Sequence, residues 1–106
     1  MLKIFGSDMC PDCRECKINF DMNNIEYEYV DINKSLRDLK DFLKLRDSLP
    51  VFDHTKEINN IGIPAIVDED GTVILDWKSY LTKHDLPVLY KEGNQKTVCS
   101  IDGEGC

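Results

Sequence analysis

The sequence has no excess of positive charge, no long hydrophobic run and only one tryptophan. Its 13 Lys and Arg residues are outnumbered by 20 Asp and Glu residues, and the resulting net charge of -7 would repel a nucleic-acid backbone. No stretch approaches the roughly 20 apolar residues that cross a bilayer, and the first residues lack the apolar core of a secretory signal. We therefore expect no nucleic-acid partner, no membrane partner and a cytoplasmic location.

The chain also lacks the length for two domains joined by a linker. Its 106 residues suit a single domain with one core. The last stretch is polar and contains glycines and two cysteines, which is typical of a tail rather than of a packed element. We expect a domain over residues 1–91, a C-terminal tail over residues 92–106, and a monomer.

The chain contains five cysteines, and their number needs a chemical explanation. The five cysteines occur in a sequence without an export signal, and the cytosol keeps structural thiols reduced. A disulfide framework is therefore not the expected use. Redox chemistry or metal binding is the better interpretation.

Apolar periodicity predicts alternating strands and helices. The strands are expected over residues 2–5, 25–30, 65–67 and 72–75, and the helices over residues 11–22, from about residue 35 to Pro50, and over 77–90. The second helix has the clearest pattern, with an apolar stripe formed by Leu36, Leu39, Phe42 and Leu43. Residues 51–58 suggest at most one or two further helical turns.

The order of these elements predicts an α/β fold. It reads strand, helix, strand, helix, strand, strand, helix. The opening strand-helix-strand unit requires a parallel pair, whereas a turn over Asp68-Glu69-Asp70-Gly71 requires an antiparallel one. A four-stranded mixed sheet flanked by helices on both faces satisfies both requirements.

The segment Cys10-Pro11-Asp12-Cys13 lies between the first strand and the first helix. A C-x-x-C motif in such a place, in a chain without an export signal, indicates thiol-disulfide exchange. Cys10 would lie at the helix N-terminus, where free N–H groups and the helix dipole stabilise a thiolate and lower its pKa. Cys13, one turn later, would resolve the mixed disulfide. Pro11 suits the first helical position, and the charge of Asp12 should disfavour the thiolate.

The rival interpretation is a metal or iron-sulfur carrier. Cys10, Cys13 and Cys16 form a C-x-x-C-x-x-C series, and Cys99 or Cys106 of the tail would supply a fourth ligand. Three ligands on a single helix cannot easily surround a cluster. We therefore expect Cys16 to be a small buried apolar residue. We expect no resident metal.

Two segments carry a resemblance to the glutaredoxins and their thioredoxin-fold relatives. They are Phe5-Gly6-Ser7-Asp8-Met9-Cys10-Pro11-Asp12-Cys13 and Ile61-Gly62-Ile63-Pro64-Ala65-Ile66-Val67. The latter segment is similar to the cis-proline stretch that precedes the third strand of that family. With the element order between them, the resemblance covers about residues 1 to 90.

The resemblance implies a thioredoxin-like fold and a substrate-binding surface. It implies that Pro64 is cis and lies against Cys10, and that the backbone of Ile63 pairs with an extended substrate. Pro11 and Asp12 join that surface by the same resemblance. From the residues alone, an ordinary trans proline has the higher base rate.

Departures from the family pattern concern glutathione. Ser7 and Asp12 stand where many glutaredoxins have Lys and Tyr, and the Gly-Gly and Asp of the glutathione site have no clear counterpart around Leu75, Asp76 and Ser79. Substitute cations would be Arg14, Lys17 or Arg37, although such residues are more often solvated. Glutathione is therefore one candidate co-substrate, and a thioredoxin reductase is another candidate reductant.

The sequence thus predicts a thiol-disulfide oxidoreductase without a tightly bound cofactor. It would reduce protein disulfides or mixed disulfides through attack by Cys10 and resolution by Cys13. A binding module without enzymatic activity is a third interpretation, and it predicts that Cys10→Ser leaves function intact.

Overall fold

The computed structural model describes residues 1–90. The predicted tail of residues 92–106, with Cys99 and Cys106, lies outside the described residues.

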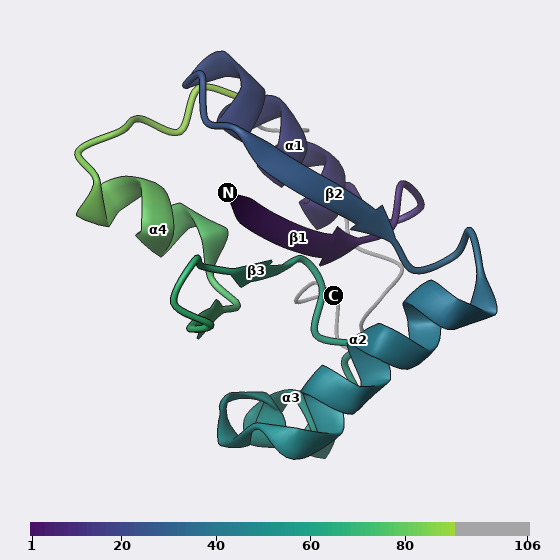
Figure 1. The fold of residues 1–106 in the computed structure, drawn as a ribbon. Helices are drawn as coiled ribbons and strands as arrows, with labels where there is room; N and C mark the ends of the chain where they lie inside the picture. Colours follow the sequence, from purple (N-terminus) through teal and green to yellow (C-terminus); the bar gives the residue numbers. More distant parts are fainter. Residues whose placement is uncertain (91–106) are drawn as a thin grey trace.

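The sheet is four-stranded and mixed, as predicted (Figure 1). Its strands are β1 (Leu2–Gly6), β2 (Tyr27–Asp31), β3 (Ala65–Val67) and β4 (Val73–Ile74), in the order β2-β1-β3-β4. Strand β1 runs parallel to β2 and antiparallel to β3, and β3 pairs with β4 in an antiparallel hairpin. The parallel pair places the carboxyl ends of β1 and β2 at one edge of the sheet, where helix α1 begins.

The helical part differs from the predicted order. The helices are α1 (Pro11–Met22), α2 (Leu36–Ser48), the 3-10 helix η1 (Pro50–Phe52), α3 (Asp53–Glu57) and α4 (Trp77–Lys83). The simple order of seven elements was therefore wrong, because a short helical pair separates α2 from β3. Pro50 ends one helix but also begins the next, since its fixed φ suits a first helical turn.

Helix α4 ends earlier than predicted. It stops at Lys83 instead of residue 90, before Pro87 is reached. Asp85 adopts a left-handed φ of 56°, and the backbone N–H of Leu86 donates to the carbonyl of Leu81 at 2.9 Å. This capping turn takes the chain out of the helix before the proline is reached.

Strand β2 begins two residues later than predicted. The N–H of Ile25 donates to the carbonyl of Phe20 at 2.9 Å, and Asn24 has a left-handed φ of 58°. Ile25 therefore closes helix α1 instead of opening the strand.

Two apolar clusters fill the two faces of the sheet. The Cys13 cluster comprises Phe5, Cys10, Cys13, Ile32, Phe42, Phe52, Ile63 and Ala65. The Phe20 cluster comprises Leu2, Ile4, Cys16, Phe20, Ile66, Trp77 and Leu81. Helices α2 and η1 therefore cover one face, and α1 and α4 cover the other (Figure 1). Flanking helices on both faces confirm that part of the prediction.

Helices α2 and α1 each contain a residue whose burial is unusual for its residue type. Leu36 was expected in the apolar stripe of α2 but is 79% exposed, because it is the first helical residue after the cap Ser35. Asn19 of α1 is a polar side chain, but it is fully buried. Its amide binds the backbone of Leu89 and Tyr90, which satisfies a buried polar side chain.

Within residues 1–90, no helix combines the length and the apolar character that a membrane span requires.

Candidate redox site at the start of helix α1

Cys10 is the N-cap residue of α1, as predicted. Its backbone is extended, with φ -96° and ψ 119°, and Pro11 occupies the first turn. The Cys10 carbonyl accepts from the N–H of Arg14 at 3.1 Å, which is the first helical hydrogen bond. The sulfur of Cys10 is thus attached at the positive end of the helix dipole, where a thiolate is stabilised.

The three described cysteines are in two oxidation states. Cys10 is disulfide-bonded, whereas Cys13 and Cys16 carry free thiols. Because a disulfide sulfur does not titrate, the lowered pKa of the Cys10 thiol stays a prediction.

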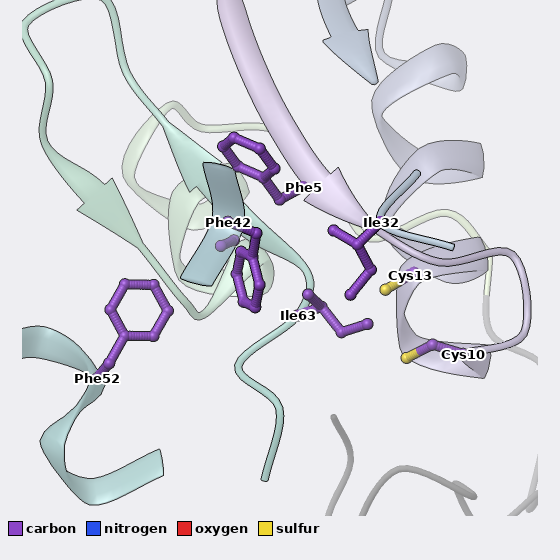
Figure 2. Packing of buried hydrophobic residues seen from close by; sticks show 8 residues of the cluster. Phe5, Cys10, Cys13, Ile32, Phe42, Phe52 and Ile63 are labelled. Atoms are coloured by element: carbon purple, nitrogen blue, oxygen red, sulfur yellow. The ribbon is translucent and has the colours of Figure 1, made fainter. Parts of the chain in front are cut away.

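Cys13 lies one turn behind Cys10 and is fully buried. Figure 2 shows both sulfurs on the same side of the helix start, directed toward Ile32 and Ile63. Burial raises the pKa of the Cys13 thiol from its ordinary value of 9.0 to about 12, and the charge of Asp12 acts in the same direction. A backbone hydrogen bond from Ser7 acts in the opposite direction. Cys13 is therefore a protonated thiol at neutral pH that needs help to become a nucleophile.

Cys16 belongs to the other face of the sheet. It is fully buried in the Phe20 cluster, and burial holds its pKa well above the usual range. The prediction of a small buried apolar residue is confirmed. Cys10, Cys13 and Cys16 therefore do not converge, and residues 1–90 contain no group of three or more His, Cys, Asp or Glu residues arranged to hold a metal ion.

Asp12 makes a contact that the sequence did not reveal. The indole Nε1 of Trp77 donates to its carboxylate at 3.1 Å. Trp77 begins helix α4 and is buried, with 2% relative exposure. This bond holds the carboxylate of Asp12, whose charge raises the pKa of Cys13.

A small hollow opens beside Cys10. It measures about 160 Å³, and its lining comes from three separate segments: Ser7, Met9, Cys10, Ile32, Asn33, Ile61 and Ile63. The peptide bond between Ile63 and Pro64 is cis, as the resemblance implied. Ile63 shares the hollow with Cys10, whereas a direct contact of the buried Pro64 with Cys10 stays a prediction. Within the described part of the chain, no charged side chain lines this hollow.

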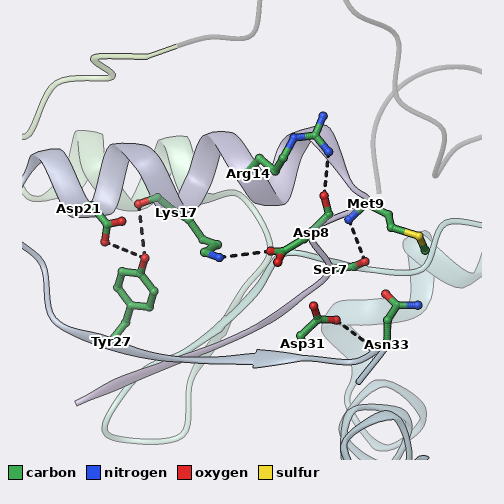
Figure 3. Close-up of polar contacts among 9 residues, drawn as sticks. All are labelled: Ser7, Asp8, Met9, Arg14, Lys17, Asp21, Tyr27, Asp31 and Asn33. Carbon is green, nitrogen blue, oxygen red and sulfur yellow. Dashed lines mark hydrogen bonds and ion pairs between the residues drawn. The ribbon is translucent and has the colours of Figure 1, made fainter. Parts of the chain in front are cut away.

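The two cations nearest the motif are already engaged (Figure 3). Arg14 Nη1 donates to the carbonyl oxygen of Asp8 at 2.8 Å, and Lys17 Nζ lies 3.2 Å from the Asp8 carboxylate. These contacts fix the loop that leads from β1 into Cys10. They also occupy two of the three side chains that the sequence offered as substitutes for a glutathione-binding lysine.

Two residues of the site were missed by sequence reasoning as contributors to chemistry. Ser7 is buried; its Oγ accepts from the N–H of Met9 at 3.2 Å and its carbonyl from the N–H of Cys10 at 3.1 Å. Tyr29 of β2 comes close to Cys13 because Gly6 leaves room for it. The only available signals were the small residues Gly6-Ser7 before the motif and the alternation of β2, and neither is specific.

Comparison with known proteins places the chain in a family without assigning a function. No protein-family model matches it. The chain is 38% identical over 73 residues to an uncharacterized protein of Haemophilus influenzae. The match covers 69% of this chain and 85% of that protein. This chain belongs to the same family as the Haemophilus protein. The arrangement at α1 therefore has to be interpreted from its own chemistry.

Proposed function

We propose that this protein is a glutaredoxin-like thiol-disulfide oxidoreductase with a thioredoxin-like fold. It reduces protein disulfides or mixed disulfides through Cys10 and Cys13, as a cytoplasmic monomer, and a cellular reductant such as glutathione or a thioredoxin reductase regenerates it. The fold assignment is supported by the β2-β1-β3-β4 order, by α1 and α4 sharing one face, and by the cis bond before Pro64.

One observation carries the functional proposal. Cys10 is the N-cap residue of α1, and Cys13 lies one turn behind it as a buried free thiol. This arrangement suits a dithiol mechanism, in which Cys10 would form a mixed disulfide with the substrate. Cys13 would then resolve that mixed disulfide.

The proposed reaction moves two electrons to the substrate. The Cys10 thiolate attacks a substrate disulfide, a Cys10–substrate bond forms, and the departing substrate sulfur takes a proton. The Cys13 thiolate then attacks Cys10. The Cys10–Cys13 disulfide forms, and the second substrate sulfur leaves as a thiol. The external thiol reductant returns two electrons to the pair.

The hollow favours a protein disulfide over glutathione. Glutathione carries two carboxylates and an amino group, which need charged partners. The hollow offers Met9, Ile32, Ile61 and Ile63 instead, with Ser7 and Asn33 as polar groups. Met9 is 66% exposed at its rim and would meet an incoming apolar side chain. An apolar residue beside the substrate cysteine fits this lining.

The proposal is tested by measuring the reduction of a disulfide-bonded protein, with dithiothreitol as the reductant. The background should carry Cys99→Ser and Cys106→Ser, so that those thiols do not compete. We expect turnover by this parent, and a fall to the uncatalysed rate in Cys10→Ser.

Cys16→Ser is the matched control, since it removes a thiol from the same helix but from the other cluster. It should retain most of the activity. Equal rates for Cys10→Ser and the parent would reject the enzymatic proposal and favour a binding module.

A further inference from the structure

The Tyr29 hydroxyl is a buried polar group without a hydrogen-bond partner among residues 1–90. Such a group loses its hydrogen bonds to water and gains none from the protein, which lowers the stability of the fold. Unsatisfied buried groups are rare in native proteins and often have a function. The neighbouring Tyr27 on the same strand differs, because its hydroxyl donates to the Asp21 carboxylate at 2.8 Å (Figure 3). The unsatisfied hydroxyl of Tyr29 therefore needs its own explanation.

Gly6 shows where this hydroxyl lies. A Cβ added to Gly6 would be 2.8 Å from Tyr29 Oη and 3.1 Å from Cys13 Sγ. Both atoms therefore lie within 3.1 Å of one point at the end of β1. Because Gly6 has no side chain, the phenol oxygen and the resolving sulfur both come close to the end of β1.

The chemistry of resolution supplies a role for the hydroxyl. Cys13 is buried and lies near several carboxylates, and it must lose its proton there before it attacks the Cys10 sulfur. A phenol O–H that reaches the sulfur would donate to the thiolate but gains less from the neutral thiol. We propose that Tyr29 is the hydrogen-bond donor that stabilises the Cys13 thiolate during resolution of the mixed disulfide. This inference rests on the proposed dithiol function.

The surrounding charges are consistent with donation rather than proton removal. Carboxylates of Asp8, Asp12 and Asp31 approach Cys13 from the preceding loop, from α1 and from β2, and they oppose its ionisation. Lys17 Nζ lies 4.1 Å from the centroid of the Tyr29 ring. Tyr29 also packs against the Phe20 cluster, to which Cys16 of α1 belongs.

That setting keeps the phenol protonated. Burial raises the pKa of Tyr29 far above its ordinary value of 10.0, so it retains its proton at neutral pH and acts only as a donor. The Lys17 ammonium lies over the ring and draws electron density toward itself, which makes the O–H group of Tyr29 a stronger hydrogen-bond donor.

The test follows the two thiol steps separately, using dipyridyl disulfide, which releases a coloured thione at each step. In the full chain carrying Cys99→Ser and Cys106→Ser, the first release reports attack by Cys10 and the second reports resolution by Cys13. In Tyr29→Phe the first phase should be unchanged. The second should slow about tenfold at neutral pH, and its pH midpoint should rise by about one unit.

Tyr27→Phe is the matched control, because it removes a hydroxyl from the same strand that is bonded to Asp21. Both of its phases should equal those of the parent. An unchanged second phase in Tyr29→Phe across the pH range would overturn the role of Tyr29. A parent that shows a first phase without a second would instead reject the dithiol function itself.

A further variant keeps the test informative if Tyr29→Phe folds poorly. A fluorinated tyrosine at position 29 retains the ring and the hydroxyl but has a more acidic phenol. It should lower the pH midpoint of the second phase and accelerate that phase at neutral pH. A midpoint that stays at the parent value would contradict the proposed donation.

Discussion

The two faces of the sheet hold similar amounts of apolar side chain but differ in what they leave open. The Phe20 cluster is sealed by α1 and α4, and Phe20 packs against Tyr27 and Tyr80 with ring centroids 6.0 and 5.4 Å away. Three members of the Cys13 cluster, Cys10, Ile32 and Ile63 (Figure 2), also line the hollow beside Cys10.

Helix α1 contributes a cysteine to each face. Cys16 is enclosed with Phe20, whereas Cys13 lies behind Cys10, where the hollow begins. Equal burial therefore does not mean an equal role. A buried thiol becomes useful when a second sulfur and an opening lie within reach, and among residues 1–90 only the Cys13 face supplies both.

The largest expected effect of breaking the sealed face is on stability. Phe20→Ala should lower the free energy of unfolding by about 3–5 kcal/mol, because a fully buried aromatic ring is replaced by a cavity. Denaturant unfolding of the reduced protein measures this loss. The milder Phe20→Leu should leave the first and second thione releases at the parent rates. A change in those rates would show that the two faces are not separable.

A smaller effect is the dependence of stability on pH. Cys13 on one face and Cys16 on the other should contribute to it in the same direction. Both thiols have pKa values raised above the ordinary 9.0, so between pH 9 and 10 the unfolded chain releases protons that the folded protein keeps. Stability is therefore fully present below pH 9 and falls as pH rises, by up to about 1.4 kcal/mol per pH unit for each thiol.

Cys16→Ala should remove the share of this slope that belongs to the Phe20 face. Unfolding free energies of the reduced parent and variant, measured between pH 8 and pH 10, give the comparison. A slope identical to that of the parent would mean that Cys16 is not protected in the folded state.

Local sequence patterns predicted the positions of the two cysteines of the open face correctly. The C-x-x-C spacing and Pro11 placed Cys10 at the N-cap and Cys13 one turn later, because helix geometry alone fixes that relation. The Ser35 cap of α2 also follows from local chemistry, since its side chain accepts from the N–H of Asp38 at 3.0 Å.

Contacts between distant segments were beyond the sequence. The Trp77–Asp12 bond, the Asn19 contacts with Leu89 and Tyr90, and the approach of Tyr29 to Cys13 each join elements that only tertiary packing brings together. The burial of Asn19 could not be predicted, because its partners are backbone groups, which leave no sequence signal.

The most direct test of the account is a time-resolved disulfide map. Reduced protein carrying Cys99→Ser and Cys106→Ser is mixed with one equivalent of a disulfide-bonded peptide, quenched in acid at intervals, and digested for mass analysis. The account predicts peptide attached at Cys10 first, then a Cys10–Cys13 bond, with Cys16 a free thiol throughout. Peptide attached first at Cys13 or Cys16, or a Cys10–peptide bond that never gives way to Cys10–Cys13, would contradict it.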